Sequence, residues 1–189
     1  MTLLCTLADV QTYVGTQASD TSAAAAMEQL IEAASAFIER FCNRTFGSVT
    51  YAEVRNGNDR AKLMTNESPI TAVSSVSIDG LSIAASTGPT VAGYTFDSYA
   101  IYLRPGLAVS RFSRGVQNVE LTYTAGYTTI PADVAQACVE LIAFKLAKRT
   151  RIDKKNETLG SQQTIGFDIS DMPAGVKTAL LPYQRFTVR

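Results

Sequence analysis

The chain has 189 residues, of which 46% are hydrophobic and 18% charged, and its 17 basic and 17 acidic residues give a formal net charge of zero. This composition excludes a disordered chain, and no apolar run approaches the roughly 20 residues of a bilayer-spanning helix, so we expect a soluble protein with one sizeable core. The sequence contains no histidine, which excludes Ser-His-Asp and Cys-His catalysis and most zinc sites. Zero net charge also disfavours strong binding to free DNA, because such binding depends on a concentrated basic surface.

The three cysteines, Cys5, Cys42 and Cys138, are widely spaced and odd in number. Their spacing fits no metal site, and we interpret them as buried thiols that act as small hydrophobic residues. The N-terminus has neither a basic segment nor a long apolar one, so we predict no secretory signal and synthesis in a cytosol-like compartment.

Two helices are predicted in the first 43 residues. The stretch from Thr6 to Gly15 predicts a short helix that ends at the glycine. After a polar gap, Asp20, Thr21 or Ser22 can cap an alanine-rich helix that extends to about Asn43. Its flank carries an acidic row that is either a solvated face or, in a ring, faces a channel or a neighbour's basic loop. The acidic row consists of Glu28, Glu32 and Glu39. The stripe that faces the core consists of Met27, Leu30, Ile31, Ala34, Phe37, Ile38 and Phe41.

Residues 44–130 are rich in Val, Thr, Ser and Tyr, with turn residues at short intervals. This pattern predicts a small antiparallel sheet or sandwich of about five or six strands, inserted between two helices. We interpret residues 48–54 and 61–64, with Asn56-Gly57 between them, as a hairpin. Other strands are predicted at 70–78 before an Asp79-Gly80 turn, at 94–98, at 100–103 and at 118–126.

Residues 131–150 predict a helix that is apolar over an unusually wide part of its circumference. Pro131 suits the first helical position, and Asp133 lies in the first turn, where the helix dipole favours an anion. Such a helix is either central in its own domain or shared with a neighbouring subunit. Its apolar residues are Val134, Ala135, Ala137, Cys138, Val139, Leu141, Ile142, Phe144 and Leu146.

The end of this helix and the loop after it are strongly basic. Cations suit a helix C-terminus, so a solvated cap is one interpretation, and a surface that faces phosphate or a partner is the other. The six cations between residues 145 and 155, against Asp153 alone, are Lys145, Lys148, Arg149, Arg151, Lys154 and Lys155.

A last short helix is predicted between Asp171, which can cap it, and Pro182, which ends it, with Pro173 at an early helical position. A strand-like stretch, 164–170, precedes it. The tail that follows alternates at Phe186 and Val188, a pattern suited to adding a strand to a partner.

No catalytic constellation is visible in the sequence. Gly88–Gly93 has neither the Walker nor the dinucleotide-binding pattern, and Ser110–Gly115 is not a nucleophile elbow. Carboxylates are plentiful, but none is marked as half of an acid–base pair. We therefore predict a protein that is not an enzyme and has no cofactor and no metal.

Several motifs, in this order and spacing, resemble the head-to-tail connector (adaptor) proteins of tailed bacteriophages. Tyr123–Asp133, YTAGYTTIPAD, is similar to the family's approach to a helix. Leu180–Arg185, LLPYQR, is similar to its closing motif, with Leu181 directly before Pro182 rather than one residue earlier. LADVQTYVG, FCNRTF and PITAVSSVSIDG are also similar, so that the resemblance covers nearly the whole chain outside residues 81–117.

The resemblance implies a structural virion protein of the neck, made in the bacterial host cytoplasm. Family members form a ring, commonly of twelve subunits, beneath the portal. The ring extends the DNA channel, through which double-stranded DNA passes without sequence-specific binding, and it offers the docking surface for a tail-side stopper or tail-completion protein. The alternative function is a nucleic-acid-binding module that uses the basic loop at 145–155.

Together these inferences predict an α+β fold, in which a small bundle of about four helices carries an inserted antiparallel sheet or sandwich. Residues 1–43 and 131–189 would form a ring-forming helical domain with a C-terminal tail, and residues 44–130 the β domain. We expect the subunit interface to include Phe37, Phe41, Leu141, Phe144, Lys148 and Arg149. We expect the portal-docking tail to include Tyr183, Arg185, Phe186 and Val188.

Overall fold

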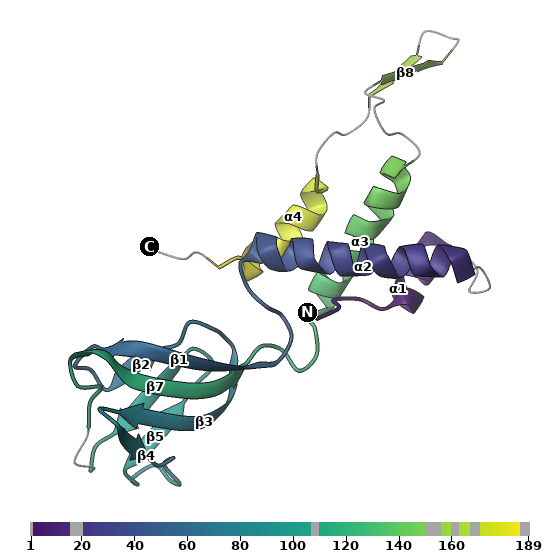
Figure 1. Cartoon of the computed structure of the whole chain (residues 1–189). Coiled ribbons are helices and arrows are strands. Elements are labelled where there is room, and N and C mark those ends of the chain that lie inside the picture. Colours follow the sequence, from purple (N-terminus) through teal and green to yellow (C-terminus); the bar gives the residue numbers. More distant parts are fainter. Residues whose placement is uncertain are drawn as a thin grey trace. The chain divides into compact units, whose positions relative to one another are not determined.

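The structure is a computed structural model that describes residues 2–15, 21–106, 110–149, 156–159, 163–166 and 171–185. It divides into two compact units. The helical unit comprises Met1–Arg44 and Ile130–Arg189, and the β unit comprises Thr45–Thr129. A sheet unit thus interrupts a helical one, and the predicted α+β class is confirmed (Figure 1).

The described residues of the helical unit form four α-helices, namely α1 (Leu7–Val14), α2 (Thr21–Cys42), α3 (Ala132–Arg149) and α4 (Ala174–Leu180). Helix α3 packs against each of the other three, and Figure 1 shows α2 crossing it. A short 3₁₀ helix, η1 (Leu181–Tyr183), follows α4, and a two-stranded hairpin of β8 (Asn156–Leu159) and β9 (Gln163–Gly166) lies between α3 and α4 in the chain. The apolar helix at 132–149 is therefore central to its own unit.

The ends of α1 follow from local chemistry. The Thr6 hydroxyl accepts a hydrogen bond from the Asp9 N–H, and the Asp9 carboxylate accepts one from the Thr6 N–H, which is a capping box. Gly15 ends the helix in the left-handed region, at φ 76°. Both ends agree with the prediction.

The starts of α3 and α4 differ from the predicted ones. Helix α3 begins at Ala132, and the Pro131 carbonyl accepts hydrogen bonds from the amides of Val134 and Ala135, so the proline precedes the helix instead of opening it. Asp171 does not cap α4, because Pro173 holds the N-cap position with no side-chain hydrogen bond. Helix α2 begins at Thr21, and the candidate cap Asp20 lies outside the described residues.

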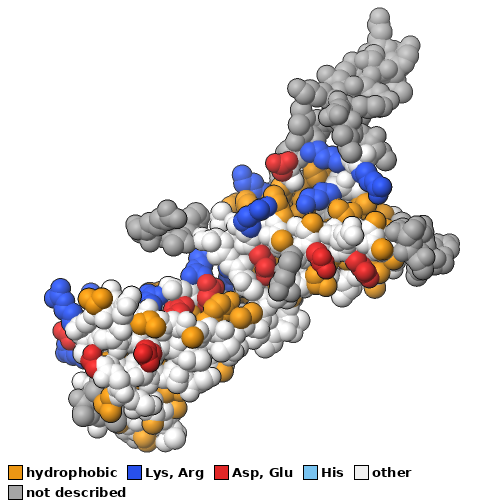
Figure 2. All heavy atoms as spheres, viewed as in Figure 1, with side chains coloured by type: hydrophobic (Ala, Val, Ile, Leu, Met, Phe, Trp, Pro, Cys, Tyr) orange, Lys and Arg blue, Asp and Glu red, His pale blue; other side chains and the backbone are white. Residues whose placement is uncertain are grey.

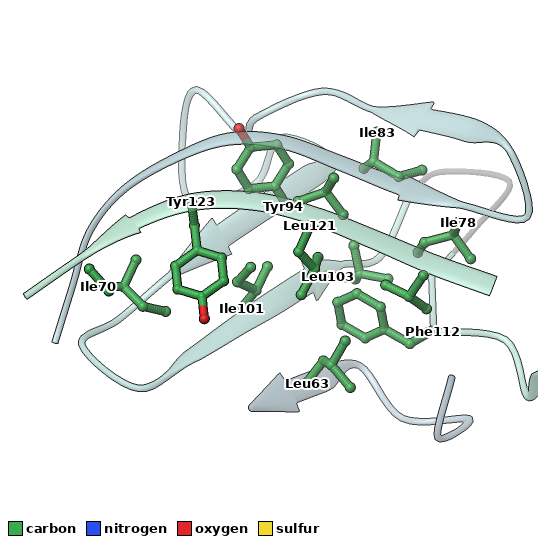
Figure 3. Packing of buried hydrophobic residues seen from close by; sticks show 13 residues of the cluster. Leu63, Ile70, Ile78, Ile83, Tyr94, Ile101, Leu103, Phe112, Leu121 and Tyr123 are labelled. Carbon is green, nitrogen blue, oxygen red and sulfur yellow. The ribbon is translucent and has the colours of Figure 1, made fainter. Parts of the chain in front are cut away.

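Where the structure describes it, the β unit contains two antiparallel sheets. The first has the strand order β1-β7-β3-β4 and the second the order β2-β6-β5. Figure 3 shows side chains from both sheets meeting in one core, which includes Leu63, Ile101 and Leu103 from the second sheet and Leu121 and Tyr123 from the first. The strands are β1 (Val49–Gly57), β2 (Lys62–Met64), β3 (Ile70–Ile78), β4 (Leu81–Ile83), β5 (Gly93–Phe96), β6 (Ala100–Arg104) and β7 (Gly115–Ala125).

The predicted hairpin across Asn56-Gly57 is wrong. Strand β1 pairs with β7, whereas β2 pairs with β6 in the other sheet. Gly57 belongs to β1, where its N–H donates to the Asn118 side chain at 2.9 Å and a Cβ would lie 1.7 Å from the Ser113 carbonyl oxygen. The glycine is thus required by a close approach of backbone from elsewhere in the sandwich, not by a turn.

The Asp79-Gly80 turn is confirmed. Asp79 and Gly80 have φ of 52° and 78°, and they join β3 to β4 with Ile78 paired to Leu81. Two successive left-handed residues are what a tight hairpin turn requires. Strand β4 was not predicted, because only three residues, LSI, signal it.

Candidate assembly surface of the helical unit

Cations and phenylalanine rings meet where the C-terminal halves of α2 and α3 lie together. The Lys145 Nζ lies 5.1 Å from the centre of the Phe37 ring, and the Arg40 guanidinium carbon 5.8 Å from the same ring. The Lys148 Nζ lies 5.1 Å from the Phe144 ring. We call these five residues, together with Arg149, the basic–aromatic surface. The cations lie over the rings of Phe37 and Phe144, which are only half-buried. Part of each ring is therefore exposed to solvent next to positive charge.

The helical geometry of α3 explains the pairing of these residues. Phe144 and Lys148 are four apart, as are Lys145 and Arg149, so each pair lies in one row along the helix. Lys145 then reaches across to Phe37 on α2. Two pairs, Phe37–Arg40 and Phe144–Lys148, could have been found from their spacing in the sequence. The contact between Lys145 and Phe37 could not, because it depends on how two helices pack.

Acidic side chains lie on the other flank of α2. The buried stripe of this helix contains Met27, Ile31, Ala34 and Ile38. At about 100° per residue, Phe37 lies roughly 100° to one side of the stripe, and the exposed Glu28 and Glu32 lie roughly 100° to the other side. Figure 2 shows acidic side chains in a row along α2 and basic ones over the ends of α3 and α4. The acidic side chains Glu28 and Glu32 and the basic–aromatic surface thus lie on different flanks of α2.

Most of the wide apolar arc of α3 is used inside the subunit. Leu141 is fully buried, at 0% exposure, so its side chain is not available to a neighbour, and we do not retain it as an interface residue. Phe144 and Leu146 are half-buried, as are Phe37 and Phe41 on α2. On α3, the large apolar side chains that remain partly exposed thus lie in its C-terminal third. The other buried residues of α3 are Val134, Ala137, Cys138, Val139 and Ile142.

The start of the C-terminal tail is attached to its own helical unit. The Tyr183 hydroxyl lies 2.9 and 2.8 Å from the two carboxylate oxygens of Asp133, in the first turn of α3. The Arg185 N–H donates to the Cys42 carbonyl at 2.9 Å, and the Gln184 side chain lies 3.4 Å from the Phe41 carbonyl. These bonds satisfy carbonyls at the end of α2 that the helix itself leaves unpaired. Phe186 and Val188 lie outside the described residues, as do Arg151, Lys154 and Lys155.

The described part of the chain contains no group of three or more Cys, Asp or Glu side chains that could hold a metal ion. None of its helices is long and apolar enough to span a bilayer.

The chain belongs to the head completion protein family, whose model matches residues 3–186. This membership agrees with the resemblance to phage head-to-tail connectors and supports a structural role. A comparison with curated proteins found no match.

Solved structures with the same fold come from gene transfer agent (GTA) particles. A chain of the neck of an empty GTA particle, computed with C6 symmetry, is 17% identical with a TM-score of 0.59, and the match covers 100% of this chain and 95% of that one. A chain of the virion of the native particle is 19% identical with a TM-score of 0.56. A chain of the native neck, computed with C12 symmetry, is 17% identical with a TM-score of 0.56. In both of these the match covers 97% of this chain and 90% of the other.

Proposed function

We propose that this chain is a structural protein of the head–tail neck of a phage-like particle, and that its copies form a ring beneath the portal. The ring extends the channel through which double-stranded DNA passes, and it offers the docking surface for the tail-side stopper or tail-completion protein. The observation that carries the proposal is the likeness over the whole chain, in family and in fold, to proteins of this kind.

A ring of twelve subunits is the arrangement we favour. The two neck structures that share the fold were computed with C6 and C12 symmetry. A twelvefold ring satisfies both, because sixfold rotation is contained in twelvefold rotation. Closed rings are built from heterologous interfaces, in which two different surfaces of each subunit meet.

The two surfaces of the helical unit provide such an interface. We propose that Glu28 and Glu32 of one subunit face the basic–aromatic surface of the next. Opposite charges would set the register, and the half-buried rings of Phe37, Phe41 and Phe144 would supply apolar area at the centre. Residues 1–43 and 131–189 then act as the ring-forming domain, and residues 44–130 as an insertion carried by it.

The decisive experiment is imaging and native mass measurement of the chain mixed with the portal protein of its own particle. We expect a ring of twelve copies on the portal. A chain that stays monomeric with the portal but binds DNA with a steep salt dependence would instead support the nucleic-acid-binding alternative at 145–155. The mixture must contain the portal, because it can be the template on which the ring closes.

The tail provides a separate prediction about portal attachment. We propose that it docks on the portal, with Tyr183 and Arg185 fixing where it leaves the helical unit. Deleting Phe186–Arg189 should leave the fold intact, because the described contacts of Tyr183 to Arg185 remain, but should weaken portal binding more than tenfold. Biolayer interferometry with immobilised portal measures this change.

A matched pair of point variants tests the alternating pattern of the tail. Phe186→Ser should weaken portal binding, whereas Thr187→Ala should not, since a tail that adds a strand to the portal would turn successive side chains to opposite faces. Portal binding that is unchanged by the deletion would refute the assignment of the tail.

A further inference from the structure

The N-terminal segment, α2 and α3 meet at a small buried polar centre. The Leu4 N–H donates to the Ser35 hydroxyl at 3.1 Å, and Ser35 itself is fully buried on α2. The Ser35 Oγ lies 3.9 Å from the Cys138 Sγ on α3. The Cys5 Sγ lies 3.5 Å from the same sulfur. The segment before α1 is therefore held on the central helix by a pair of thiols and one hydroxyl.

The two thiols differ in chemical character. Cys5 donates its S–H to Cys138, and this hydrogen bond lowers the pKa of Cys138 while the pKa of Cys5 is raised well above its usual range. When the pair loses a proton, the negative charge is therefore most stable on Cys138. Cys5 is 6% exposed and Cys138 is not exposed at all. Their burial thus shields both sulfurs from bulky reagents.

The third cysteine lacks such a neighbour. The Cys42 Sγ is fully buried at the end of α2, 3.9 Å from the Leu180 carbonyl oxygen. Burial raises its pKa to about 11, so it stays a protonated thiol at neutral pH. Cys42 therefore serves as an internal control for reactivity that depends on the pairing of Cys5 with Cys138.

We propose that Cys5 and Cys138 form a redox-responsive pair, which is a dithiol in a reducing cytoplasm and becomes an intrachain disulfide when the protein meets a peroxide. The contact requires little movement, since the sulfurs must approach by roughly 1.5 Å to reach the length of a disulfide bond. Cys5 lies outside a helix, between Leu4 and the N-cap residue Thr6, so this shift breaks no helical hydrogen bond.

The reaction proceeds in two balanced steps. The Cys138 thiolate attacks one oxygen of hydrogen peroxide, the O–O bond breaks, and a sulfenic acid and, after proton uptake, one water form. The Cys5 sulfur then attacks the sulfenic sulfur, the S–O bond breaks, and the hydroxyl leaves as a second water. Two thiols are oxidised and one peroxide is reduced to two waters.

The disulfide closes a long loop. Cys5 and Cys138 are 133 positions apart, and the loop contains α1, α2 and the whole β unit. Closing so large a loop reduces the entropy of the unfolded chain more than that of the folded one. The cross-link also prevents the N-terminal segment from detaching from α3. It acts as a lock that is set only after folding, outside a reducing environment.

The test treats the folded full-length protein with hydrogen peroxide after removal of the reductant. Peptide mapping without reduction should recover Cys5 linked to Cys138, with Cys42 still a free thiol. The melting temperature should rise by roughly 5–15 °C and return to its starting value with dithiothreitol. Cys42→Ser should behave like the wild type, whereas Cys5→Ser should lose the peroxide-dependent shift.

Two results would overturn the inference. In one, all three thiols remain free in the folded protein under peroxide conditions that oxidise the urea-unfolded chain, or the disulfides that form involve Cys42 or a second molecule. In the other, the Cys5–Cys138 disulfide forms but lowers the melting temperature, which refutes its role as a lock. Peptide mapping of the wild type decides the pairing even where a cysteine variant fails to fold.

Discussion

Reversing both charges in Lys148→Glu/Arg149→Glu is expected to abolish assembly of the chain into a ring on the portal. The proposed interface then sets these glutamates against Glu28 and Glu32 of the next subunit, so attraction becomes repulsion. Close charge pairs at interfaces contribute about 1.5 kcal/mol or more, which is over tenfold in affinity for each subunit contact. The same loss repeats at every interface of a closed ring. Negative-stain imaging and native mass measurement with portal report the outcome.

The chain offers a matched control for this charge reversal. The Lys62 Nζ lies 5.4 Å from the Tyr102 ring in the β unit, a contact like that of Lys148 with Phe144. Lys62→Glu removes a lysine from an aromatic ring in the same way but outside the proposed interface. It should therefore leave ring assembly unchanged.

Rescue distinguishes pairing between subunits from other uses of the basic–aromatic surface. Combining Lys148→Glu/Arg149→Glu with Glu28→Lys/Glu32→Lys should restore the ring, because the opposite charges are exchanged. The Glu28→Lys/Glu32→Lys variant alone should assemble poorly. Loss without rescue would instead indicate that the basic residues contact the portal or DNA. Assembly that survives each reversal separately would refute the interface.

Substitutions of Leu141 and Phe144 should have different effects, although both residues lie on α3. The first should lower the stability of the chain, and the second should mainly weaken ring assembly. Leu141→Ala leaves a cavity in the core of the helical unit, and we expect a loss of about 2–5 kcal/mol in the free energy of unfolding. Phe144→Ala removes a half-buried ring, so we expect a small loss of stability, about 1 kcal/mol, together with weakened ring assembly. Urea unfolding followed by the helical circular dichroism signal measures the first effect, and native mass with portal the second.

An exposed apolar residue outside the interface provides the control for truncation. Val116 in the β unit is 84% exposed, and Val116→Ala should change neither quantity measurably. The assignment would be wrong if Phe144→Ala destabilised the free chain as much as Leu141→Ala does. It would also be wrong if Phe144→Ala left assembly intact.

Local signals in the sequence were sufficient for most of the elements. Thr6 and Gly15 bound α1, and Asp79-Gly80 turns between β3 and β4, because capping and tight turns depend on a few neighbouring residues. Asn56-Gly57 carries the same kind of turn signal and yet lies at the end of β1. Its partner is β7, almost sixty residues further along the chain, and a local pattern cannot indicate which distant strand will pair.

The candidate assembly surface also has some features that the sequence shows and others that only the folded structure creates. The apolar and basic character of residues 131–149 is visible in the sequence. The spacing of Phe144 and Lys148, which lie about one helical turn apart, is visible there as well. The attachment of Tyr183 to Asp133, and of Arg185 to the end of α2, joins segments that are far apart in sequence. No periodicity could have indicated these contacts.

The excess apolar surface of α3 illustrates the difference most clearly. The sequence by itself determined that this helix needs partners on several sides, since apolar residues cover most of its circumference. Only the tertiary structure decided that α1, α2 and α4 are those partners. It also decided that Leu141 is buried in the core while Phe144 is only half-buried. The physical reason is that hydrophobicity is a property of each residue, whereas burial depends on which other segments fold against it.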